Sequence, residues 1–283
     1  MSRKKALKIT IQKLSARFSF KKEDYMKGLI KAEFYKQKIN GLFDMYLIIM
    51  LFAGIGISVS SVLGDEASND WFWYYNNFIS NSMVINIIIA AIASFYYVRD
   101  FNDKSIQHVL MSGYRRKDAV SAKFIVFNTE TIAAFLIYLS SSIITVFAMK
   151  GTKLYHNYNI SIYGYIFVSI IFKLLFITAL NCIYMCFCYL VRNVFAYSLA
   201  IFALWASFLG TLYKMNFVKN NIILRTILKL TVNVQDQVMF ADRIGSGMYK
   251  ITGSEAALFI CVMLATAVIF YKLCLQIWHS YEL

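Results

Sequence analysis

The chain has 283 residues, of which 59% are hydrophobic, and it carries a formal net charge of +14 at pH 7. This hydrophobic fraction exceeds the roughly 45–50% of soluble globular domains, so the composition excludes an ordinary soluble protein and indicates an integral membrane protein. A basic excess in such a protein is typical of cytoplasmic segments that face anionic lipid, and binding to nucleic acid is the weaker explanation.

Residues 1–41 are predicted to form a cytoplasmic basic tail followed by a helix at the membrane surface. Twelve lysines and arginines lie in this region, and no uninterrupted apolar stretch precedes Leu42, a pattern that does not fit a cleavable signal peptide. Met26, Ile30 and Phe34 recur at helical spacing, and lysines beside them can face lipid headgroups. We therefore expect an interfacial elbow helix ahead of the first membrane span.

Six apolar stretches are long enough to cross a membrane, whose core of roughly 30 Å requires about 20 helical residues. They cover residues 42–63, 78–98, 124–148, 162–191, 195–212 and 256–275. The predicted fold class is therefore an all-α integral membrane protein, in which residues 42–283 form a six-span transmembrane domain.

Lysine and arginine are distributed unevenly over the loops between these spans. Twelve precede the first span and six lie between the second and third spans, whereas the loop after the first span has none. Because positive residues favour the cytoplasmic side, both termini are predicted to be cytoplasmic. Residues 213–255 are then predicted to lie outside and to contain a re-entrant or interfacial segment, since their apolar block IILRTILKL is too short to span.

Three polar side chains are predicted to lie inside the membrane: Glu130, Lys173 and Asn181. A lysine near the centre of a span costs roughly 2.5–3.5 kcal/mol on insertion scales. Glu130 in the third span is the candidate counter-ion of Lys173 in the fourth, and snorkelling of Lys173 is the alternative. We expect Asn181 to form a helix–helix hydrogen bond rather than to bind a substrate.

Motifs for catalysis or metal binding are missing from the sequence. It has no GxxxxGK[ST] phosphate-binding loop and no HExxH motif. The five cysteines lie within apolar stretches, and the three histidines are too distant from them in sequence to suggest a metal site. We therefore expect a chain that is not an enzyme, has no disulfide framework, and binds no cofactor or metal itself.

The loop between the second and third spans carries the candidate partner-binding residues. An apolar face at helical spacing precedes Gly113, which suits the left-handed conformation that ends a helix. An ordinary basic loop is the alternative reading, because short charged loops are common in membrane proteins. The candidate residues are Lys104, Ser105, Ile106, Val109, Leu110, Gly113, Arg115 and Arg116.

This loop resembles the cytoplasmic loop between the second and third spans of type-2 ABC exporter permeases from low-GC Gram-positive bacteria. The segment LIKAEFYKQK ahead of the first span, with Glu33, is similar to the elbow of that family, but relatives often have a proline before the last span where this chain reads VNVQDQVMF. The resemblance implies that the loop is a coupling helix that docks on a separate ATPase. The similar features of the loop are its charged start at 99–103, Lys104-Ser-Ile, Leu110, Ser112-Gly113, Arg116 and Lys123.

The same resemblance implies a pair of permeases, formed by two copies or two related subunits, with ATP and Mg²⁺ bound by the partner ATPases. Its expected partners also include membrane lipid and a hydrophobic or amphipathic cargo, such as an antimicrobial or cytolytic peptide. A membrane receptor or immunity protein that sequesters a peptide without transporting it is the alternative. Two small-xxx-small pairs in the first span permit close helix contact, either within the chain or between permeases: Gly54 with Ser58, and Gly56 with Ser60.

Overall fold

The computed structural model describes residues 26–64, 71–102, 111–112, 114–151, 160–191, 203, 208–209, 212–241 and 252–280. These described residues are almost entirely helical and contain no β-strand. Four of their helices are long and apolar enough to cross a membrane, which gives the chain the character of an all-α, multi-pass membrane protein. They are α2 (Leu42–Gly64), α6 (Arg116–Lys150), α7 (Ile160–Val191) and α13 (Gly253–Ser280).

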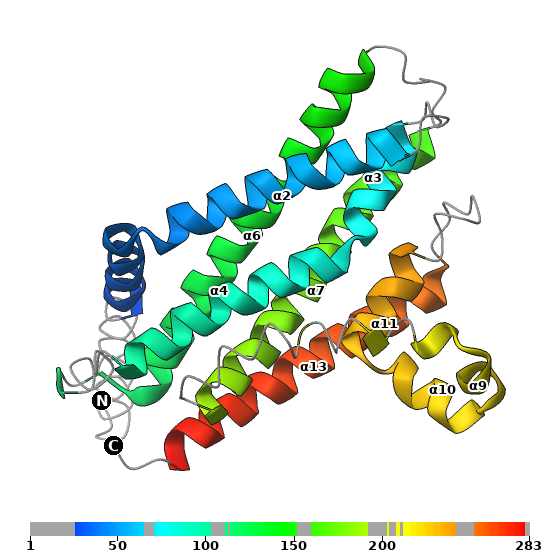
Figure 1. The fold of residues 1–283 in the computed structure, drawn as a ribbon. Helices are drawn as coiled ribbons and strands as arrows, with labels where there is room; N and C mark the ends of the chain where they lie inside the picture. Colours follow the sequence, from blue (N-terminus) through cyan, green and yellow to red (C-terminus); the bar gives the residue numbers. More distant parts are fainter. Residues whose placement is uncertain are drawn as a thin grey trace, which may run out of the picture.

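These four helices correspond to the first, third, fourth and sixth predicted spans. α6 begins eight residues before the predicted span, because its first two turns pack against the bundle and bury Val120, Ala122 and Lys123. The predicted fifth span, 195–212, lies almost entirely outside the described residues. α2 packs along α6, and α7 packs along α13 and α4 (Figure 1).

The second predicted span corresponds to two helices that meet at a bend. α3 (Trp71–Ser80) is separated from α4 (Ser82–Asn102) by Asn81, and the two axes differ by 41°. Counted as one broken span, this pair is a fifth crossing. The prediction of one continuous span over 78–98 missed α3, because asparagines interrupt its aromatic sequence WFWYYNNF and lower its apolar character.

Aromatic contacts define the two ends of the bundle. Tyr189 near the end of α7 packs against Tyr97 near the end of α4 and against Trp278 near the end of α13. At the opposite end, Phe259 near the start of α13 packs against Phe240. The end of α7 and the segment that contains Phe240 therefore lie in opposite halves of the bundle.

A helix over residues 26–40, called the N-terminal helix below, precedes α2 (Figure 1). The two helices are joined at Gly41, whose φ of 63° lies in the left-handed region that favours glycine. The N-terminal helix lies at the same end as the C-terminal end of α4, since Arg99 donates a hydrogen bond of 3.1 Å to the Asn40 side chain. A helix ahead of the first span is thus present where the sequence predicted one.

The helices α2 and α6 approach each other closely at Gly54. A Cβ atom there would collide with side-chain and backbone atoms of α6. The Ser58 hydroxyl donates to the carbonyl of Ser142 at 3.1 Å, and the Ser142 hydroxyl donates back to Gly54 at 3.3 Å. Gly56 and Ser60 lie on the other face of α2, with open space at Gly56. The Gly54–Ser58 pair therefore serves a contact within the chain.

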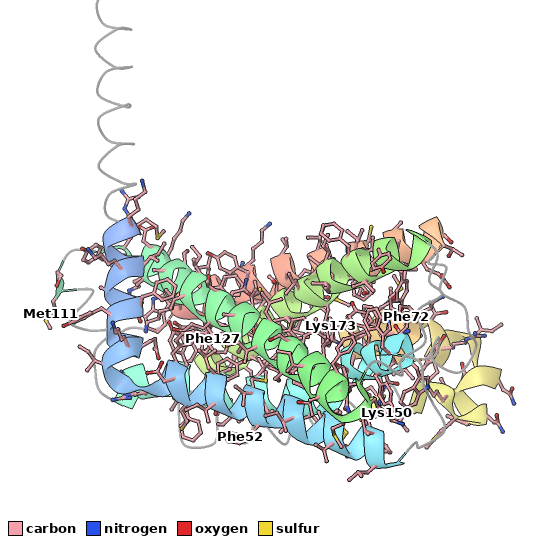
Figure 2. The ribbon with its side chains drawn as sticks, turned by 90° about the horizontal axis from the view of Figure 1, so that it is seen from above. Phe52, Phe72, Met111, Phe127, Lys150 and Lys173 are labelled. Atoms are coloured by element: carbon pink, nitrogen blue, oxygen red, sulfur yellow. The ribbon has the colours of Figure 1, made fainter. Side chains whose placement is uncertain are left out.

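The exterior of the bundle is strongly apolar, as expected for a surface that faces lipid. Phe52 projects outward from α2 and is 65% exposed, whereas Phe127 on α6 is fully buried among the helices (Figure 2). Lys173 also lies inside the bundle (Figure 2). Exposed large apolar side chains are common on lipid-facing surfaces, and a lysine at such a depth requires a partner.

Four short helices follow one another before α13, at the end opposite the N-terminal helix (Figure 1). α10 buries none of its residues, whereas α11 and the π-helical turn η3 pack against α3, α7 and α13. The predicted segment between the last two spans therefore has an exposed part and a part that enters the bundle. The four helices are α9 (Asn216–Asn220), α10 (Ile222–Lys229), α11 (Val232–Asp236) and η3 (Gln237–Ala241).

Candidate functional site

Lys173, near the middle of α7, forms a buried ion pair with Asp236 at the end of α11. The Lys173 Nζ lies 2.7 Å from Oδ1 and 2.9 Å from Oδ2 of Asp236, and both residues are completely buried. The ammonium group also lies 4.6 Å from the ring centre of Phe176 and 5.2 Å from that of Phe240. Two hydrogen bonds and two aromatic faces offset the several kcal/mol that removing each ion from water costs. The pair fastens α11 and η3 to α7.

The prediction that Glu130 is the counter-ion of Lys173 is wrong. Lys173 also does not snorkel, because its side chain is fully enclosed. Asp236 was missed because it reaches α7 from a short helix that does not read as a span. The only sequence signal was its place as the single acidic residue in the apolar segment VNVQDQVMF.

A second group of buried charges joins the N-terminal helix to α6. Leu29, Glu33 and Gln37 recur every four residues and form the buried face of the N-terminal helix. The Lys123 Nζ lies 3.4 Å from Oε1 and 3.5 Å from Oε2 of Glu33. Tyr96 on α4 donates a hydrogen bond of 3.3 Å to the Lys123 carbonyl, so three helices meet at this ion pair.

Burial raises the pKa of Glu33 above its ordinary value, and the positive charge of Lys36 partly opposes this effect. Glu33 was predicted only as part of an elbow at the membrane surface, and its burial against α6 was not foreseen. The predicted stripe of Met26, Ile30 and Phe34 lies beside the buried face, and Phe34 is exposed.

Glu130 lies two helical turns further along α6 than Lys123 and belongs to the same group. Its side chain is 3% exposed, and its Oε1 has no hydrogen-bond partner among the described residues. The charge of Glu33 acts on Glu130, and the charge of Glu130 acts on Tyr46 of α2 and Tyr96 of α4. We call Glu33, Lys123 and Glu130 the carboxylate cluster. It contains two buried carboxylates and one buried ammonium group.

Asn181 joins two of the long helices, as expected from the sequence. Its Nδ2 donates a hydrogen bond of 2.9 Å to Oδ1 of Asn128 on α6, and Asn181 itself is fully buried. Amide pairs of this kind hold membrane helices together. The structure therefore gives Asn181 a helix–helix contact, separate from the carboxylate cluster.

The predicted docking loop is described only in part. Lys104, Ser105, Ile106, Val109, Leu110 and Gly113 lie outside the described residues. Arg115 is exposed at the N-terminal boundary of α6, and Arg116 is the first residue of that helix. A helical apolar face in this loop therefore stays a prediction from the sequence.

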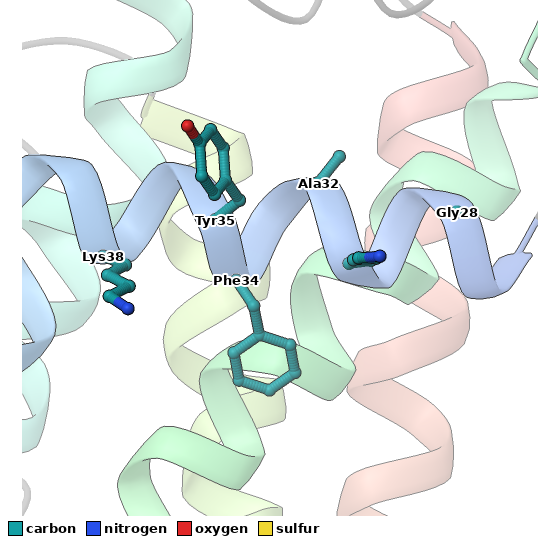
Figure 3. A pocket seen from close by; sticks show the side chains of 6 residues that line it. Gly28, Ala32, Phe34, Tyr35 and Lys38 are labelled. Atoms are coloured by element: carbon teal, nitrogen blue, oxygen red, sulfur yellow. The ribbon is translucent and has the colours of Figure 1, made fainter.

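The outward face of the N-terminal helix carries a shallow groove of about 500 Å³ (Figure 3). Phe34 and Tyr35 project from different sides of the helix in Figure 3, and Lys38 lies one turn further on. This face is apolar with lysines at its margins, a pattern typical of a helix at a membrane surface. The lining residues are Gly28, Lys31, Ala32, Phe34, Tyr35 and Lys38.

Within the described part of the chain, no group of His, Cys, Asp and Glu side chains could hold a metal ion. The five cysteines are free thiols, and four of them are buried. No protein-family model matches the sequence, and comparison with curated proteins finds no match. The features of the chain that bear on function are therefore its buried charges and the predicted docking loop.

Proposed function

We propose that the chain is the permease subunit of an ATP-driven exporter of the type-2 ABC class. Two permeases would work as a pair with separate ATPase subunits that bind ATP and Mg²⁺. The cargo would be a hydrophobic or amphipathic molecule, such as an antimicrobial or cytolytic peptide, moved by alternating access. The proposal places the chain in the cell membrane of a Gram-positive bacterium, with both termini in the cytoplasm.

The observation that carries this proposal is the junction of three elements beside the predicted docking loop. The ion pair of Lys123 with Glu33 ties the start of α6 to the N-terminal helix, and Tyr96 ties α4 to the same turn of α6. Residues 103–115 connect α4 to α6 in sequence, so the predicted docking loop begins and ends at two helices that meet here. A partner that moves the loop would displace α4, α6 and the N-terminal helix together.

The buried pair of Lys173 and Asp236 supports a transport role in a second way. Ionisable side chains inside a membrane are costly and usually mark a functional pathway or a moving part. The Lys173–Asp236 pair holds a short segment, α11 and η3, among α3, α7 and α13. We propose that this segment lies on the outer side and closes the permease there.

The proposal is tested by replacing the apolar face of the docking loop. In the variant Val109→Asp/Leu110→Asp, we expect normal membrane insertion, because these positions lie between spans and outside the hydrocarbon. We also expect the loss of the copurifying ATPase and of cargo export, since an apolar anchor at an interface is worth about 2 kcal/mol or more. The tagged chain is purified from its native host in mild detergent. ATP hydrolysis is then assayed, and mass spectrometry searches for a chain with a GxxxxGK[ST] loop.

A matched control introduces the same two charges at the other end of the molecule. Ile222 and Ile223 on α10 are exposed, and Ile222→Asp/Ile223→Asp should keep the ATPase. Equal ATPase recovery from the loop variant and the wild type would contradict the proposal. If the wild type retains a peptide but never an ATPase, the chain is instead a receptor or immunity protein.

A further inference from the structure

The carboxylate cluster is unbalanced in charge, because it contains two carboxylates and only one ammonium group. Lys123 is engaged with Glu33, and Glu130 is buried with an oxygen that has no hydrogen-bond partner among the described residues. An ionised carboxylate in an apolar interior is unfavourable by several kcal/mol unless it is paired. The arrangement therefore calls for one more positive charge at Glu130.

The geometry of α6 keeps Lys123 from supplying that charge while it is bound to Glu33. Seven residues separate Lys123 from Glu130, so the two lie on the same face of α6 but about 10 Å apart along its axis. Lys123 is directed to the N-terminal helix by its contact with Glu33. Glu130 lies two turns further along α6 and is 3% exposed.

Titratable groups from four elements interact electrostatically with Glu130 or share its cluster. They are Glu33 on the N-terminal helix, Tyr46 on α2, Tyr96 on α4 and Lys123 on α6. Further out, Lys36 acts on Glu33, and Tyr184 of α7 acts on Tyr46. The Tyr46 hydroxyl faces Thr131 but makes no hydrogen bond of good geometry. Among the described residues, two buried oxygens thus have no hydrogen-bond partner, Glu130 Oε1 and the Tyr46 hydroxyl.

We propose that Glu130 is a proton-binding site that opens to the end of the bundle where the N-terminal helix lies. One proton from water binds the Glu130 carboxylate and forms an O–H bond, and the same bond breaks when the proton leaves. A proton needs a single oxygen, whereas an alkali cation needs several oxygens around it. No metal-binding group of side chains occurs in the described residues. This inference does not depend on the proposed exporter function.

Proton binding at Glu130 sets how firmly the N-terminal helix is held. When Glu130 is neutral, Glu33 is the one carboxylate of the cluster that attracts Lys123. When Glu130 is ionised, two carboxylates repel each other and compete for Lys123. Proton uptake therefore strengthens the tie between the N-terminal helix and α6, and proton release weakens it.

Infrared difference spectroscopy on the purified full-length chain in lipid nanodiscs tests the site. Near neutral pH the wild type should show the C=O stretch of a buried protonated carboxyl group, and the band should disappear at alkaline pH. Glu130→Gln should abolish the band. Asp44→Asn, which removes an exposed carboxyl group from the first turn of α2, should leave it unchanged.

Two further variants distinguish a proton site from a merely structural residue, and they keep the test valid if Glu130→Gln fails to fold. Lys123→Met should move the titration of the band to higher pH, because it removes a nearby positive charge. Glu33→Gln should move it to lower pH, because it removes a nearby negative charge. The proposal is overturned if the wild type lacks the band. It is also overturned if neither substitution changes the pH at which the band titrates. A band that vanishes on adding sodium or potassium at fixed pH would also overturn it, in favour of a cation site.

Discussion

The two groups of buried charges lie in different parts of the bundle and are built differently. Lys173 and Asp236 match one ammonium group with one carboxylate at 2.7 Å, between two aromatic rings. The carboxylate cluster sets one ammonium group against two carboxylates, with a longer contact of 3.4 Å. Each group fastens an element outside the long helices to the bundle. The balanced pair suits a fixed attachment, and the unbalanced cluster suits an attachment that responds to a proton.

The largest effect is expected from breaking the balanced pair. Lys173→Met leaves Asp236 fully buried without its cation, and such a loss destabilises a protein by about 3–5 kcal/mol. The free energy of unfolding is measured by titration with sodium dodecyl sulfate in mixed micelles. The double variant Lys173→Met/Asp236→Leu should recover much of the loss, because it removes both charges. A loss below about 1 kcal/mol in the single variant would show that Lys173 and Asp236 are not a buried ion pair shielded from solvent.

A smaller effect is expected from Lys123→Met in the carboxylate cluster. Its two carboxylates can both take up protons, so we expect a loss of about 1–3 kcal/mol in the same titration. The pKa of Glu33 is already raised in the folded chain, so the folded state binds more protons than the unfolded state above the ordinary pKa of 4.5. Stability must then fall as the pH rises through the folded pKa. A cost of Lys123→Met that shrinks as the pH rises would contradict this account of the cluster.

The smallest effect is expected from an exposed contact at the same end. Asn40→Ala removes the acceptor for Arg99, a solvent-exposed hydrogen bond of 3.1 Å. Exposed charged contacts contribute about 1 kcal/mol or less, so the free energy of unfolding should change by less than in Lys123→Met. A loss as large as that of Lys123→Met would mean that surface contacts, rather than the buried cluster, hold the N-terminal helix.

The long spans were predictable from the sequence because an apolar stretch of sufficient length needs no knowledge of its neighbours. The bend at Asn81 was not predictable from the sequence, because α3 is stabilised by aromatic packing against other helices. One example is the packing of Phe72 on Tyr165. The ion-pair partner of Lys173 also could not be predicted from the sequence. This partner is 63 residues away, in a segment too short to be assigned a depth in the membrane.

The N-terminal helix shows a different limit of sequence reasoning. Apolar periodicity predicted the helix, but its buried face contains Glu33 and Gln37 beside Leu29. In a membrane protein the surface is as apolar as the interior, so apolar residues do not by themselves reveal which face packs against protein. Buried polar residues such as Glu33 mark that face, and the pattern could have been found by asking which charges require partners.

A pair of double-mutant cycles tests most directly whether the two groups of charges are separate and differently built. One cycle combines Lys173→Ala with Asp236→Ala, and the other combines Lys173→Ala with Glu130→Ala, each followed by the free energy of unfolding. The account predicts a coupling of about 1–3 kcal/mol between Lys173 and Asp236, and additivity within about 0.5 kcal/mol between Lys173 and Glu130. Coupling of Lys173 to Glu130, together with additivity toward Asp236, would contradict it.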